Sequence, residues 1–149
     1  MVGIDKTAWA EGPWKREPDR AHWTDKATGL DCLILRGPRG ALCGYVGVPV
    51  GHPWHGGSYD GMECDVHGGL TYAGYDNPKI GISVEGGAGL YWVGFDCSHA
   101  GDLAFMNRPG FFNSFSNPFD TYRNFCYVRG ECIRLAAQAA EGKITLPDP

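Results

Sequence analysis

Glycine constrains the fold of this chain more than any other residue type. It occupies 23 of the 149 positions, about twice its usual share of ~7%. Ten prolines interrupt the chain further. Because glycine has no side chain, it marks turns and places where the backbone closely approaches another group. We therefore expect a chain of short elements with many turns and several close backbone contacts.

Short apolar runs between the glycines predict β-strands. Residues 30–37 form a short apolar run that ends in turn residues, residues 41–50 form a second run, and residues 90–96 are aromatic and β-branched. The first two runs predict a hairpin, because only a short turn of proline and glycine separates them. Residues 62–74 begin as an alternating strand that breaks at a glycine pair, and residues 80–89 predict a further short strand and turn.

A single helix is expected near the end of the sequence. Apolar residues recur at helical spacing from Phe125 to Ala139. Asp120 or Thr121 can cap its start, and Gly142 is placed to end it. Strands followed by one helix indicate an α+β fold with a mostly antiparallel, twisted sheet and glycine-rich loops.

The length fits one domain over residues 1–149 with a core of its own. We divide it into a polar N-terminal arm (1–29), a sheet with motif loops (30–104), an aromatic loop (105–119) and the C-terminal helix (120–141). These boundaries follow the changes from polar to apolar and from apolar to aromatic composition.

Charge and composition limit the partners. The net charge of −4 argues against a nucleic-acid polymer, which needs a basic surface, but not against a small phosphate ligand. No run of about 18 apolar residues predicts a membrane span, and the first residues lack the apolar stretch of a signal peptide. Six cysteines without such a signal predict reduced thiols in a cytoplasmic protein.

Three glycine-framed segments each combine a histidine with a carboxylate. They are Gly51-His52-Pro53 with Tyr59 and Asp60, Asp65-Val66-His67-Gly68-Gly69-Leu70-Thr71, and Asp96 to Asp102 with His99. Strands of one sheet can bring such segments to the same edge, which predicts a functional site there. The alternative for each segment alone is a polar turn at the end of a strand.

The candidate catalytic residues are His67, His99, Asp96 and Asp102. Two histidines can serve as general acid and general base near neutral pH. A neighbouring carboxylate fixes the tautomer of an imidazole, which is the role expected of the aspartates.

Other residues of the three segments are candidates for ligand binding. Free backbone N–H groups in a glycine pair suit an anion, and aromatic rings beside them suit a nucleobase. The predicted ligand-binding residues are His52, Tyr59, Asp60, Gly68, Gly69, Thr71 and Trp92.

The cofactor stays undetermined at this stage, with a divalent metal as one alternative. Its candidate ligands are Asp65, His67, Asp96, His99 and Asp102. A structural zinc held by cysteine and histidine would show unusual ligand spacing. A Cys97 nucleophile is opposed by strand parity, because Cys97 and Asp96 point to opposite faces.

The motifs GYVGVPVGHPWHGGSYD (44–60), VHGGLTY (66–72) and YWVGFDCSHAGD (91–102) resemble those of a family of small proteins encoded by tailed phages and prophages. The order and spacing of the motifs match as well. The family's last motif often continues into a proline, whereas Leu103 follows Asp102 here. The resemblance implies that family motif positions are occupied by His52, Tyr59, Asp60, His67, Thr71, Asp96, His99, Gly101 and Asp102.

The resemblance implies a phage or prophage origin and says little about mechanism. Small phage proteins often serve counter-defence by cleaving or sequestering nucleotide signals, an analogy of context only. The leading hypothesis is a phosphodiesterase-like hydrolase that degrades a small nucleotide immune signal, with cyclic nucleotides as the first choice, in the bacterial host cytoplasm. The alternatives are a non-catalytic nucleotide sponge and an inhibitor that binds a host defence protein. The phenylalanines of 105–119 also suit a homo-oligomer interface.

Overall fold

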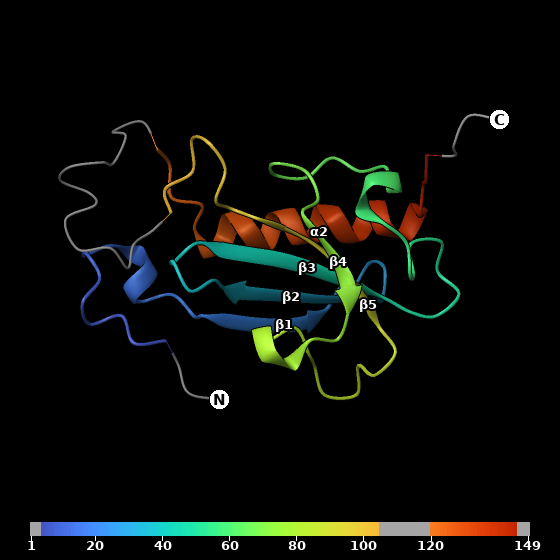
Figure 1. The fold of residues 1–149 in the computed structure, drawn as a ribbon, viewed down its shortest axis with the longest axis horizontal. Helices are drawn as coiled ribbons and strands as arrows, with labels where there is room; N and C mark the ends of the chain where they lie inside the picture. The colour runs from blue at the N-terminus through green and yellow to red at the C-terminus, as the bar shows by residue number, and fades with distance from the viewer. Residues whose placement is uncertain (1–3, 105–119, 146–149) are drawn as a thin grey trace.

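The computed structural model describes residues 4–104 and 120–145, which form an open five-stranded sheet with a long helix packed on it (Figure 1). The strands are β1 (Arg20–Thr24), β2 (Asp31–Arg36), β3 (Leu42–Val48), β4 (Tyr72–Tyr75) and β5 (Tyr91–Asp96). The helices are α2 (Phe125–Glu141) and the 3₁₀ turns η1 (Pro13–Lys15), η2 (Tyr59–Gly61) and η3 (Pro78–Ile80). The strand order is β1-β2-β3-β5-β4 and every neighbouring pair is antiparallel. The predicted α+β fold is confirmed.

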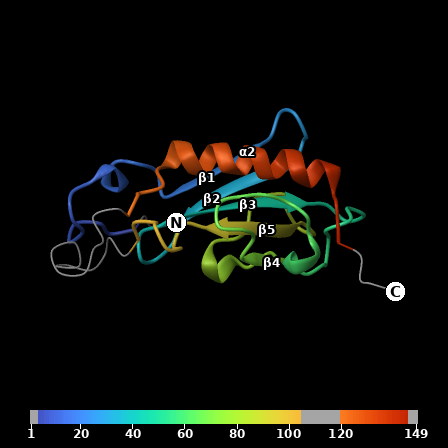
Figure 2. The ribbon, with the colours of Figure 1, turned by 90° about the horizontal axis from the view of Figure 1, so that it is seen from above.

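Helix α2 lies along one face of the sheet, as Figure 2 shows. Its buried stripe includes Val128, Cys132 and Leu135, which join one apolar cluster with the strand residues that point toward the helix. Gly44 permits this approach, because a Cβ there would lie 2.6 Å from the Cys132 Sγ. The opposite face carries a second, smaller cluster, which includes Trp92.

The helix begins later than its sequence predicts. Asn124 is the N-cap, and its side chain accepts a hydrogen bond from the Tyr127 N–H at 2.8 Å. Thr121 lies three residues before this cap, where its backbone exchanges hydrogen bonds with Gly101 and Leu103. The predicted end at Gly142 is confirmed, with φ of 63° in the left-handed region.

The alternating segment expected as a strand over 62–67 is extended but pairs with no strand. Its buried Met62 and Val66 face the core, which explains the alternation. Met62 makes an isolated bridge with Ile144, and the Glu63 N–H donates to the Lys143 carbonyl. The N–H groups of Asp65 and His67 donate to the α2 side chains of Gln138 and Glu131. The strand predicted here begins only after the glycine pair, as β4.

Two further expectations differ from the structure. The arm expected over 1–29 contains an edge strand, β1, which pairs with β2. Residues 80–89 form no strand, since only Ile82 makes an isolated bridge, with Asn77. The aromatic loop predicted for 105–119 lies outside the described residues. In the described parts of the chain, no helix has the length and apolar character needed to cross a membrane.

Candidate active site

His67, His99 and Asp102 converge beside the first turn of α2. The His67 Nε2 lies 2.8 Å from the Asp102 Oδ2, and the His99 Nδ1 lies 3.5 Å from the same oxygen. The ring centroids of the two histidines are 5.8 Å apart. Two of the three predicted segments therefore meet, as expected from their sequence.

The extended segment along α2 places His67. The His67 backbone N–H donates to the Glu131 carboxylate at 2.9 Å, and Glu131 is held in turn by Arg134 at 2.6 Å. Val66, which is 5% exposed, anchors the segment in the core. The imidazole thus approaches the sheet from a backbone that is fixed to the helix.

A tight turn after β5 places His99 and Asp102. The Asp102 N–H donates to the His99 carbonyl at 2.9 Å, and the His99 N–H donates back to the Asp102 carboxylate at 3.0 Å. Asp96 accepts a hydrogen bond from the Ser98 N–H, and its Oδ1 lies 3.5 Å from the His99 Nδ1. Asp96 therefore both closes the turn and lies beside the imidazole.

Gly68 is required by His99 rather than by an anion. A Cβ at Gly68 would lie 2.4 Å from the His99 ring, and its φ of +67° lies in the left-handed region. The neighbouring Gly69 N–H donates to the Val66 carbonyl at 2.9 Å. It is not free for the phosphate that the sequence predicted it to bind.

Asp102 is the electrostatic centre of the site, with its side chain 1% exposed. Burial alone would raise its pKa, but hydrogen bonds from His67, Arg123 and the His99 N–H outweigh burial and lower it. The Arg123 Nε donates to its Oδ1 at 2.9 Å. Asp102 is therefore held as a carboxylate.

Arg123 and Tyr127 complete the cluster and were missed by the sequence analysis. The Tyr127 hydroxyl lies 2.7 Å from the His67 Nδ1. The Arg123 guanidinium lies over the Tyr127 ring, 5.1 Å from its centroid. Tyr127 lies in the first turn of α2, whereas Arg123 precedes the N-cap Asn124, so no helical spacing in the sequence relates the two residues.

A hydrogen-bonded chain thus runs from Arg123 through Asp102 and His67 to Tyr127. Because the Asp102 carboxylate accepts from Nε2, the Nδ1 of a neutral His67 is left to accept the Tyr127 O–H. The His99 Nδ1 is buried and makes no hydrogen bond, although two carboxylates lie near it. Its Nε2 has no hydrogen-bond partner within the residues described, and the His99 side chain is 31% exposed.

His52 lies elsewhere, at the far end of α2. Its Nε2 lies 2.6 Å from the Ala139 carbonyl, and its Nδ1 accepts from the Trp54 N–H. Tyr127 and Ala139 are separated by roughly 18 Å along a helix that rises 1.5 Å per residue. His52 therefore supports the loop that covers the helix end and does not join the site.

The remaining predicted residues also lie outside the cluster. Trp92 is fully buried on the opposite face of the sheet, where its Nε1 donates to Asp76. Tyr59 and Asp60 are exposed in η2. Thr71 is exposed next to β4, and its N–H donates to the Gly94 carbonyl.

The cysteines carry no chemistry at this site. All six are free thiols. Cys97 is 1% exposed, and burial raises its thiol pKa well above the usual range. The Cys97 nucleophile considered from the sequence is therefore not supported.

The same cluster could hold a metal ion. Among the described residues, His67, His99 and Asp102 offer ligand atoms that all lie within 4.8 Å of one another. Two imidazoles and a carboxylate suit a transition metal with an open position. Arg123 already binds that carboxylate, and Asp65, another predicted ligand, pairs with Arg134 instead.

The comparisons with known proteins give no relative. No protein-family model matches the chain, and no curated protein or solved structure matches it either.

Proposed function

We propose that this protein is a phosphodiesterase-like hydrolase that acts on a small nucleotide. The observation that carries the proposal is the hydrogen-bonded chain from Arg123 to Tyr127, with the His99 ring 5.8 Å from that of His67. The His99 Nε2 can serve as the general base, and His67, which is bound to the Asp102 carboxylate, can supply the proton for the general acid.

In the proposed reaction, the His99 Nε2 takes a proton from water while the water oxygen attacks phosphorus. The bond from phosphorus to the leaving oxygen breaks with its electron pair, and that oxygen receives the Tyr127 proton. Protonated His67 then donates its Nδ1 proton to the Tyr127 oxygen, while its Nε2–H stays hydrogen-bonded to Asp102. His99 then releases its proton to solvent, and His67 takes one up.

Arg123 is the proposed phosphate-binding residue. Its Nε is bound to Asp102, but its two η nitrogens make no hydrogen bond within the described residues. A guanidinium fits two phosphoryl oxygens at once, so it can stabilise the charge that develops on them.

The nucleotide character of the substrate, and a counter-defence role against a cyclic immune signal, are supported by the phage-family resemblance alone. The net charge of −4 agrees with a small ligand rather than a nucleic-acid polymer. An inhibitor of a host defence protein stays an alternative, because the phenylalanines that suggest it lie outside the described residues.

The test is incubation with cyclic dinucleotides and cyclic ADP-ribose isomers, with product separation by chromatography. His99→Gln is expected to lower kcat by about 10²–10⁴. Its matched control is His22→Gln, because His22 also contacts a carboxylate, Asp31 at 2.9 Å, but lies on the edge strand. This control should retain full activity.

If wild type leaves every compound intact with and without Mg²⁺, Mn²⁺ or Zn²⁺, the hydrolase proposal is wrong. A ligand that is retained by the protein and recovered intact after denaturation would indicate the sponge instead. Activity that appears only with an added metal, together with metal binding by wild type that is lost in His67→Gln, would assign the metal to the three-residue cluster.

A further inference from the structure

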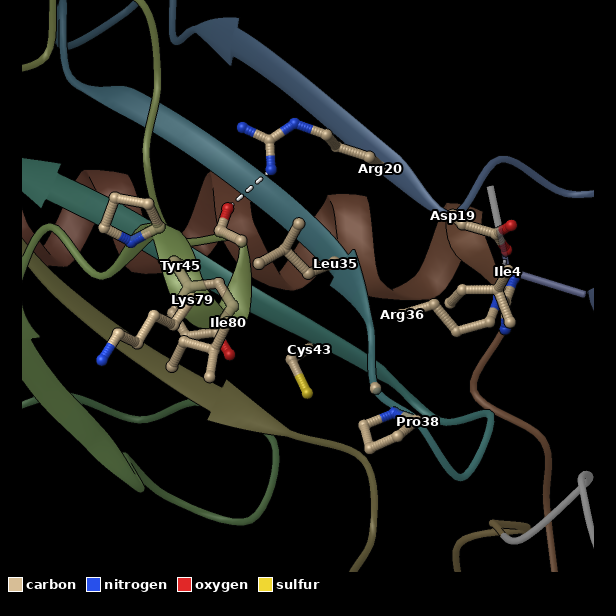
Figure 3. Close-up of a pocket in the computed structure, with 13 residues that line it drawn as sticks. Ile4, Asp19, Arg20, Leu35, Arg36, Pro38, Cys43, Tyr45, Lys79 and Ile80 are labelled. Atoms are coloured by element: carbon tan, nitrogen blue, oxygen red, sulfur yellow. Dashed lines mark hydrogen bonds and ion pairs between the residues drawn. The ribbon is translucent and has the colours of Figure 1, made fainter. Parts of the chain in front are cut away.

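A pocket of about 850 Å³ opens on the face of the sheet opposite α2 (Figure 3). It shares no residue with the histidine cluster. Its apolar lining comes from β2, β3 and η3, with Leu35, Cys43, Tyr45 and Ile80 as the main contacts. Pockets that hold small ligands typically measure about 300–1,000 Å³ and are mostly apolar, as this one is.

Arg20 fixes one wall of the pocket. Its Nη1 donates to the Gly81 carbonyl at 2.6 Å, and its Nη2 donates to the Ser83 carbonyl. These bonds tie the loop that contains η3 to the edge strand β1. This wall of the pocket is therefore held in place by the fold.

The charges around the pocket do not cancel. Arg36, which is fully buried, contacts the carboxylates of Asp19 and Glu17. Arg20 and Lys79 line the same pocket, yet neither has an acidic partner among the described residues. A chain of net charge −4 thus places two uncompensated cations beside an apolar floor.

An acidic group lies near Cys43 but outside the lining of the pocket. Cys43, whose side chain points into the pocket in Figure 3, pairs across the sheet with Asp96. Burial, with a smaller contribution from the charge of Asp96, raises the pKa of the Cys43 thiol to about 11. An anionic group is therefore disfavoured near Cys43 and favoured on the side of Arg20 and Lys79.

We propose that this pocket binds a small organic anion with an apolar body. The body would lie on Leu35, Cys43 and Tyr45, and the anionic group would lie beside Arg20 and Lys79. A carboxylate, a sulfonate and a phosphate monoester share this chemistry. None of the residues that line the pocket belongs to the histidine cluster, although Asp96 lies between Cys43 and the His99 imidazole.

The test is a fluorescence titration with 8-anilinonaphthalene-1-sulfonate and, for comparison, with its neutral analogue N-phenyl-1-naphthylamine. Cys43→Phe should lower the affinity for the sulfonate by about tenfold or more, because the ring fills the pocket. Cys126→Phe is the matched control, since Cys126 is exposed on α2, and should bind as wild type does.

The charge is tested by Lys79→Gln against Lys26→Gln, both exposed lysines. The first should weaken binding of the sulfonate by about threefold, and the effect should shrink in high salt. The second should have no effect. Equal affinity for the charged and neutral dyes would overturn the proposal, as would unchanged binding by folded Cys43→Phe.

Wild type offers a second measurement that does not depend on a variant folding. The sulfonate should slow alkylation of Cys43, measured by peptide mass mapping, and leave that of Cys126 unchanged. Displacement of the dye by adenosine monophosphate would identify a phosphate ligand, and displacement by octanoate would identify a carboxylate. Failure of both to displace it, with no protection of Cys43, would also overturn the proposal.

Discussion

Gly68 shows how a single residue can hold a site together without taking part in chemistry. The His99 ring occupies the space where any other residue would carry its Cβ. Gly69 has a similar positive φ, +81°, but nothing lies within 4 Å of its Cβ position. A substitution at Gly69 therefore strains only the backbone, whereas a substitution at Gly68 strains the backbone and also displaces His99.

Gly68→Ala and Gly69→Ala should both lose about 1 kcal/mol of stability from the left-handed backbone. Only Gly68→Ala should also displace His99 and lower the activity toward a cleaved nucleotide. Urea unfolding and the imidazole signals in NMR spectra measure the two effects. Equal activity of both variants would contradict the contact seen between Gly68 and His99.

Asp102 gives a pH dependence with a definite sign. Its pKa is lowered in the folded protein, so its ionised form stabilises the fold above its ordinary pKa of 3.8. That contribution is lost as the pH falls through the lower, folded value. Asp102→Asn should therefore cost about 2–3 kcal/mol at neutral pH, and this cost should shrink progressively as the pH falls below 3.8.

Urea unfolding of Asp102→Asn and wild type across this pH range measures the difference. Asp60→Asn is the control, because the Asp60 side chain is exposed and receives no hydrogen bond within the described residues. A difference between Asp102→Asn and wild type that persists unchanged at low pH would contradict the assignment of a stabilising carboxylate.

At the residue scale, the sequence located the site only in part. His67, His99 and Asp102 could be found, because each lies in a polar motif framed by glycine. Tyr127 could not, because its role depends on where α2 begins and on which loop packs against its first turn. Trp92 was predicted to bind ligand but is buried. Strand alternation shows which face of the sheet it lies on, but it does not show which residues cover that face.

At the scale of elements, the glycine in β3 is required by packing, whereas the glycine in α2 is not. Gly44 lies under the helix, where an added Cβ would meet both Cys132 and Phe95 at 2.6 Å. Gly130 lies on the exposed side of α2, with nothing within 4 Å of its Cβ position. The same substitution should therefore change stability in opposite directions.

Gly44→Ala should destabilise the protein by about 1–3 kcal/mol, because the helix and sheet must move apart. Gly130→Ala should stabilise it by about 1 kcal/mol, because alanine favours the helix and fills open space. Thermal unfolding followed by circular dichroism compares both with wild type. Similar shifts in Tm for the two variants would contradict the packing described.

The expectation for 62–67 shows where sequence periodicity stops being informative. Alternation predicts an extended backbone with one buried face, and this segment has both. Alternation does not identify the hydrogen-bond partner, which here is a row of long polar side chains on α2 rather than a strand. Strands β2, β3 and β5 were predictable because their apolar runs end at clear turn residues.

At the scale of the whole molecule, Glu17 connects the arm, the sheet and the helix. Its carboxylate accepts hydrogen bonds from the Tyr122 hydroxyl and from the Phe125 N–H at 2.5 and 2.8 Å. It also lies 3.6 Å from the fully buried guanidinium of Arg36. The arm is therefore part of the cooperative unit rather than an appendage.

Glu17→Ala should lower the free energy of unfolding by about 2–4 kcal/mol, because it removes one partner of a buried charge. Glu11→Ala is the control, since Glu11 is 79% exposed in its pair with Lys15, and should cost less than about 0.5 kcal/mol. Unfolding should stay a single transition by tryptophan fluorescence and by circular dichroism. Separate transitions would show that the arm unfolds independently.

The position of α2 has a consequence for the order in which the protein can mature during synthesis. The histidines are translated before the helix that supplies Tyr127 and the bonds that fix their segment. A nascent chain still lacking residues 125–141 has an uncovered sheet face and no assembled site. The cluster of His67, Asp102 and Tyr127 can therefore assemble only when the helix has left the ribosome and docked on the sheet.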